Sequence, residues 1–119
     1  MLATLKEVLQ AAEDKKIAIG AFDTPNLESL CAAIAAAEEV ELPTIIMHAQ
    51  CHESLCPLDV IGPIMVEHAK KAKVPVCVML DHGEDLDYLK RSLEMGFTAV
   101  MYDGSTTPYE ENVKTTCEA

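Results

Sequence analysis

The chain has 119 residues, of which 50% are hydrophobic, and its 20 acidic and nine basic residues give a formal net charge of −11. That length and apolar content suffice for one globular domain with its own core. The negative charge argues against nucleic acid or an anionic membrane as a partner, because both would be repelled.

The N-terminal segment carries charges at amphipathic spacing, and no apolar run is long enough to span a bilayer. We therefore expect no signal peptide, no membrane partner and a cytoplasmic location. The five cysteines form no C-x-x-C pair, which argues against a disulfide framework and favours reduced thiols.

Predicted helices and strands alternate from the N-terminus onward. A capping box made by Thr4 and Glu7 predicts a first helix, and the apolar run 17–22 predicts a first strand. Residues 24–42 have the periodicity of a second helix, with Asn26 as its N-cap. The buried face of this helix is expected to comprise Leu27, Leu30, Ile34 and Ala37.

The alternation continues to the end of the chain. Three more apolar runs predict strands at 44–49, 74–80 and 97–102. Further helices are predicted at 57–73, with Gly62 and Pro63 near its start, and at 84–96, with Leu86, Leu89 and Leu93 facing the core. The segment Thr107-Pro108-Tyr109-Glu110 predicts a last helix through a second capping box with Pro at the first helical position.

This order predicts an α/β fold with a parallel sheet and helical crossovers. One possible architecture is a four-stranded doubly wound sheet, but its usual glycine-rich turn after the first strand is missing, because only Gly20 is present there. The other is the first half of a (β/α)₈ TIM barrel, an introductory helix followed by about four βα units, whose complete form needs about 250 residues.

Polar residues follow the predicted strands, where both architectures place their chemistry. Asp23, His48, the pair Asp81 and His82, and Asp103 are expected to share one rim, together with the segment "QCHE" (50–53) that follows the second strand. Asp81 and His82 combine a group for proton transfer with a metal ligand or base. Their simpler interpretation is an Asp that caps the next helix beside a His that faces solvent.

Two further groups suggest metal binding. Asp103 on the next strand lies where it can converge with His82 on a divalent metal, although for Asp103 taken alone an ordinary Asp-Gly turn is the slightly better explanation. His48, Cys51, His52 and Cys56 lie within nine residues and are all zinc ligand types, but their spacing is not that of a common zinc module.

Three segments of the sequence resemble a known family: "LKEVLQAAEDKK", "AIGAFDTPNLES" and "VPVCVMLDHGEDLDYLKRSLEMGFTAVMYDGSTTPYEEN". Nearly end to end, the chain is similar to the N-terminal half of the class II, metal-dependent ketose-bisphosphate aldolases. The resemblance implies the (β/α)₈ barrel. The family's LDHG motif falls on residues 80–83, so the resemblance implies that Asp81 is the catalytic acid and His82 a zinc ligand. Asp103 falls on the M-x-D-G-S motif, a second metal position in many members.

The resemblance also implies the reaction. The family reversibly cleaves a phosphorylated sugar, a fructose or tagatose 1,6-bisphosphate, to dihydroxyacetone phosphate and glyceraldehyde 3-phosphate, with zinc as cofactor. Asp81 is then expected to take the proton of the C4 hydroxyl in cleavage. A metal-free Schiff-base mechanism needs a lysine at a strand end, and none of the eight lysines follows a predicted strand.

The sequence departs from the family pattern as well. It stops in the helix after the fourth strand, so the family's other zinc-binding histidines and its phosphate-binding loops have no counterpart here. Asp23, Ala49, Met79 and Thr106 replace residues that are common in the family. We therefore expect the single domain 1–119 to be half a barrel, incomplete alone.

A half-barrel has open strand edges, so we expect a homo-oligomer or pairing with another chain that covers them. The alternative function is a non-catalytic half-barrel that acts as a binding or assembly subunit and holds metal through the His48–Cys56 loop.

Overall fold

In the computed structural model, which describes residues 1–119, helices and strands alternate as predicted. The helices are α1 (Leu5–Lys15), α2 (Leu27–Glu39), α3 (Leu58–Lys71), α4 (Leu86–Glu94) and α5 (Tyr109–Glu118), and a 3-10 turn, η1, spans Gln50–His52. The strands are β1 (Ala21–Asp23), β2 (Thr44–Ala49), β3 (Val76–Gly83) and β4 (Ala99–Tyr102). No helix has both the length and the apolar character needed to cross a membrane.

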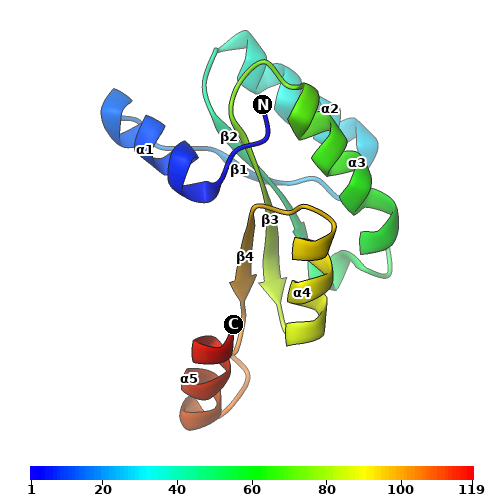
Figure 1. The fold of residues 1–119 in the computed structure, drawn as a ribbon. Coiled ribbons are helices and arrows are strands. Elements are labelled where there is room, and N and C mark those ends of the chain that lie inside the picture. Colours follow the sequence, from blue (N-terminus) through cyan, green and yellow to red (C-terminus); the bar gives the residue numbers. More distant parts are fainter.

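The four strands form one parallel sheet in the order β1-β2-β3-β4. Because this order follows the chain, successive crossovers step in the same direction and lack the reversal that defines a doubly wound sheet. In Figure 1, α2, α3 and α4 lie along one side of the sheet, while α1 lies on the other. The arrangement is consistent with part of a (β/α) barrel, and β1 and β4 each keep one unpaired edge.

The two faces of the sheet pack against different helices. On one face, Ile46, Val78 and Leu80 are fully buried in the main core with the apolar sides of α2, α3 and α4. On the other face, Ile45 and Cys77 pack against Val8 of α1 in a smaller cluster. Since strand side chains alternate between faces, Asp81 belongs to the second face, which α1 covers at one end only.

Helix starts follow the predicted caps with one exception. The capping box of Thr4 and Glu7 is formed, and Asn26 accepts a hydrogen bond from the Ser29 amide, as predicted. The second capping box, at Thr107, is wrong. Its hydroxyl donates to the carbonyl of Gly104 at 2.8 Å, so α5 begins after Pro108 without a side-chain cap.

Two residues predicted to face the core are half-exposed. Leu27 of α2 and Leu93 of α4 are 47% and 49% exposed, whereas Leu30 and Leu89 of the same helices are buried. Leu93 lines an open groove beside Val100 of β4. The predicted apolar stripe was right, but the half-sheet covers only part of it.

Candidate active site

The end of β3 carries Asp81 and His82 through a bulge. Leu80 pairs with Val100 and Gly83 with Tyr102, so β3 has one more residue than β4 between these two pairs. His82 lies in the left-handed region, with φ of 45°. Strict alternation would turn adjacent side chains to opposite faces, but a bulge changes the direction of the strand and re-aims them. Asp81 and His82 can therefore reach the same place.

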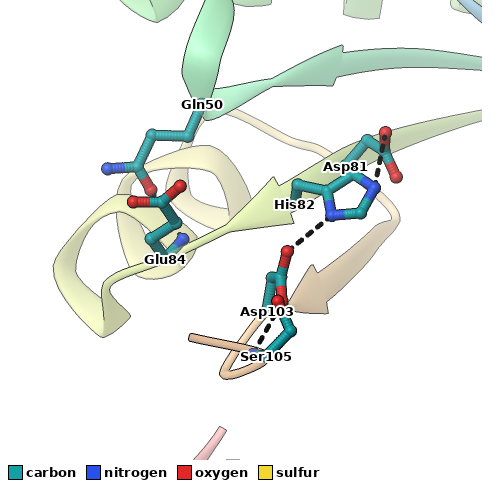
Figure 2. Close-up of polar contacts among 6 residues, drawn as sticks. All are labelled: Gln50, Asp81, His82, Glu84, Asp103 and Ser105. Carbon is teal, nitrogen blue, oxygen red and sulfur yellow. Dashed lines mark hydrogen bonds and ion pairs between the residues drawn. The ribbon is translucent and has the colours of Figure 1, made fainter. Parts of the chain in front are cut away.

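His82 lies between two carboxylates, as Figure 2 shows. Its Nδ1 is 2.7 Å from Oδ2 of Asp103, and its Nε2 is 3.8 Å from Oδ2 of Asp81. The other oxygen of Asp103, Oδ1, accepts a hydrogen bond of 2.9 Å from the amide of Ser105. If Nδ1 carries the proton donated to Asp103, the Nε2 lone pair of the neutral ring is free.

Local hydrogen bonds and charges shift the pKa values of both His82 and Asp103. Hydrogen bonds from Ser105 and from His82 lower the pKa of Asp103 to about 2. The hydrogen bond to Asp103 and the charge of Asp81 raise the pKa of His82 above its ordinary value. The imidazole therefore holds a proton more firmly than a free histidine, while Asp103 stays ionised.

We predict that Asp103→Asn lowers the pKa of His82. In the folded chain this pKa is raised, so the pairing stabilises the fold below the unfolded pKa of about 6.5 and the stabilisation is lost as pH rises through the folded value. NMR titration of the His82 ring should give a midpoint above 6.5 in the wild type and a lower one in Asp103→Asn. Asp59→Asn, an exposed change at a residue paired with Arg91, is the control and should leave the midpoint unchanged. Equal midpoints in wild type and Asp103→Asn would contradict the pairing.

Comparisons with known proteins identify the protein family. A family model described as "Fructose-bisphosphate aldolase class-II" matches residues 3–119. The chain belongs to this family. It is 32% identical to a fructose-bisphosphate aldolase of Giardia intestinalis, over 98% of this chain and 36% of that protein. It is 34% identical to a 6-phospho-5-dehydro-2-deoxy-D-gluconate aldolase of Halalkalibacterium halodurans, over 98% of this chain and 42% of that protein.

The fold agrees with the family assignment. The crystal structure of the YdjI aldolase from Escherichia coli K12 superimposes with a TM-score of 0.92 and 34% identity, covering 100% of this chain and 46% of that chain. The chain thus spans less than half the length of these class II relatives.

Class II aldolases are generally metal-dependent, and the donors at this rim fit one side of a metal site. The imidazole of His82 is exposed, its Nε2 is the free ring atom in the tautomer that donates to Asp103, and a carboxylate lies nearby. A histidine that donates its other ring N–H to a carboxylate is the usual arrangement of a metal-binding histidine. Catalytic zinc sites use three protein ligands, and no group of three or more His, Cys, Asp or Glu side chains in this chain is arranged to hold a metal ion.

His48 does not share the rim with Asp81, contrary to the sequence-based expectation. In the sheet it pairs with Leu80, so it faces the helices, where it is fully buried. Its Nε2 is 3.2 Å from the hydroxyl of Tyr88, and its Nδ1 has no hydrogen-bond partner. Burial and the nearby His52 lower the pKa of His48. The four ligands suggested by the His48–Cys56 segment, including Cys51 and His52, are not gathered into a metal-binding group.

The structure brings three further polar residues together near the rim. Gln50 and Glu53 belong to the polar segment that the sequence places there without a role of their own, whereas Tyr88 was missed. The Tyr88 hydroxyl donates to Oε2 of Glu53 at 2.6 Å, which also accepts from the Leu58 amide at 2.8 Å. Burial and the bond to Glu53 raise the pKa of Tyr88. The Tyr88–Glu53 bond and the Gln50–Asp85 bond each join residues 35 positions apart in the chain, so no local sequence pattern predicts them. The one available signal was the polar segment directly after the apolar run of β2.

Proposed function

We propose that this chain forms the N-terminal half of a zinc-dependent class II aldolase barrel that reversibly cleaves a ketose 1,6-bisphosphate to dihydroxyacetone phosphate and glyceraldehyde 3-phosphate. The observation that carries the proposal is the placement of His82 between Asp81 and Asp103 at the carboxyl ends of two neighbouring strands. Active sites of (β/α) barrels lie at this end of the strands.

Each residue of the rim has a distinct role in the proposal. Asp81 takes the proton of the C4 hydroxyl during cleavage and returns it during condensation, as a general base and acid. His82 provides one zinc ligand through Nε2. A bound zinc ion supplies Lewis-acid stabilisation of the negative charge that cleavage leaves on the three-carbon ketose fragment. Asp103 was expected as a direct ligand; because its Oδ2 holds Nδ1 of His82 at 2.7 Å, we propose that it orients His82 instead.

The substrate class follows from the family rather than from this half of the site. The relative from Giardia is named for fructose bisphosphate and the relative from Halalkalibacterium for a phosphorylated sugar acid, at similar identity to this chain. A phosphorylated sugar is common to both names. We place a fructose- or tagatose-type bisphosphate first, and the reaction in carbohydrate metabolism.

A second half of the barrel is needed in the proposal. The unpaired edges of β1 and β4 expose backbone groups that another strand can bond. Apolar grooves flank both edges, one between α2 and β1 that includes Phe22 and Val40, and one between α4 and β4 that includes Leu93. We propose that a C-terminal half, or a second copy of the chain, covers these edges.

The test is a coupled assay for triose phosphate release, run on the chain alone and after mixing with the C-terminal half of a class II aldolase. We expect zinc-dependent activity in the mixture, lost on adding a chelator and restored by zinc. Activity that persists in the chelator would count against the zinc mechanism. Metal binding that is lost in His48→Ala or Cys51→Ala but kept in His82→Ala would instead support the non-catalytic, metal-binding alternative.

A further inference from the structure

The bulge that carries Asp81 and His82 is a strained segment held from two sides. A histidine at φ of 45° is less favourable than one in the right-handed region, so its neighbours must hold it there. On the β4 side, the Asp103 amide donates to the carbonyl of Gly83 at 2.8 Å. This bond fixes one edge of the bulge.

Gln50 holds the other side. It is the first residue after β2, and its Oε1 accepts a hydrogen bond of 2.8 Å from the amide of Glu84, the residue directly after the bulge. Its Nε2 donates to Oδ2 of Asp85 at 2.8 Å. Figure 2 shows the Gln50 side chain beside Glu84, apart from the side chains of Asp81 and His82.

The second bond of Gln50 links the bulge to the start of α4. Asp85 is the N-cap of α4, and its Oδ1 accepts a hydrogen bond of 2.7 Å from the Tyr88 amide. The Asp85 carboxylate thus caps the helix with one oxygen and accepts the hydrogen bond of Gln50 with the other. The amide of a glutamine is suited to this place because it offers an acceptor and a donor on one planar group, whereas a carboxylate would bring a second negative charge to Asp85.

We propose that Gln50 is a positioning residue. By bonding both the Glu84 amide and the Asp85 carboxylate, it holds the Asp81–Gly83 bulge in the conformation that keeps His82 in the left-handed region. The importance of Gln50 for catalysis rests on the proposed function of Asp81 and His82. The effect of Gln50 on the conformation of the bulge is independent of that function.

The experiment compares the wild type with Gln50→Met, Gln50→Glu and two controls in the full chain. Gln50→Met keeps the length of the side chain and removes both hydrogen bonds, while Gln50→Glu keeps the acceptor for Glu84. Gln10→Met is the matched control, because Gln10 also donates to an aspartate, Asp14, but lies on α1. Tyr88→Phe removes the Tyr88 link to Glu53 without touching the bonds of Gln50.

We expect Gln50→Met to speed hydrogen exchange of the Glu84 amide about tenfold and to move the backbone chemical shifts of Asp81 and His82. Gln50→Glu keeps the acceptor for Glu84 but loses the bond to Asp85, so it should speed this exchange less than Gln50→Met does, and Gln10→Met should change neither signal. Unchanged exchange and shifts in Gln50→Met would overturn the proposal. An equal effect from Tyr88→Phe would also overturn it, since the conformation of the bulge would then depend on the whole segment after β2 and not on the bonds of Gln50.

A zinc titration of a barrel completed with a C-terminal half, followed at the His82 ring, separates this proposal from the proposed function. We expect Gln50→Met to weaken His82-dependent zinc binding by about 10- to 100-fold, as for other residues that support metal ligands. If the wild type shows no zinc-dependent change at His82, the metal role of His82 fails, while the exchange and shift data still decide the role of Gln50.

Discussion

Asp81→Asn is expected to lower the rate of triose phosphate release by about 10²- to 10⁴-fold in a barrel completed with a C-terminal half. The substitution keeps the size of the side chain and removes the group that accepts the substrate proton. Asp81 is suited to this task because it lies at the end of β3, beside β2 through its pairing with Ala49, and its side chain is only 16% exposed. A residue on a strand end is held more rigidly than one on a loop.

The loss should appear in kcat while zinc binding through His82 persists, because Asn leaves the imidazole and Asp103 in place. Asp87→Asn is the matched control, since it removes one exposed negative charge from the first turn of α4, a few residues along the chain. A barrel that retains wild-type kcat in Asp81→Asn would assign proton transfer to another group. A loss of equal size in Asp87→Asn would point to the general charge of the rim instead.

The elements of this fold could be predicted because each rests on a local signal. The capping box at Thr4 and the apolar runs of β2 and β3 depend on neighbours within a few residues, and the structure confirms them. The capping box at Thr107 failed although its pattern is equally good. There the hydroxyl found a carbonyl three residues earlier, an alternative that the pattern does not exclude.

Burial was harder to predict than secondary structure. Continuous apolar runs, such as those of the four predicted strands, are typical of a sheet covered on both faces, yet Phe22 is 50% exposed and Met47 and Met79 are only partly buried. Leu93 and Val40 are exposed in the same way, beside the two open edges. These exposed apolar residues lie where the proposed second half would pack, which agrees with the proposal that the chain is part of a larger barrel.

The candidate site was only partly predictable. The motif around Asp81 and His82 marked the right strand end, but a positive φ at a histidine has no sequence signal, and without it the contact between His82 and Asp103 cannot be foreseen. For His48, the error came from treating every polar residue near a strand end as part of one rim. Its pairing with Leu80 decides the face it occupies, and pairing depends on the register of two strands.

Gly83→Ala is expected to destabilise the fold by about 1 to 3 kcal/mol, because the bulge leaves no room for a side chain. A Cβ at this position would lie 2.3 Å from Cδ1 of Leu89 and 2.8 Å from Cδ2 of Leu80. Both leucines are buried in the main core, so neither can move without disturbing α4 or β3. The measurement is the free energy of unfolding in urea, at matched protein concentration.

Gly20→Ala provides a control with the same initial clash and a different outcome. A Cβ on Gly20 would lie 2.5 Å from Cε2 of Phe22, but this ring is half-exposed and can turn into solvent. Neither glycine has a positive φ, so in both cases the lower entropy of the unfolded alanine chain favours folding by about 0.4 to 1 kcal/mol. We therefore expect Gly20→Ala to be close to neutral. Equal stabilities of the two variants would mean that the bulge can relax, and that Leu80 and Leu89 do not confine the residue that follows His82.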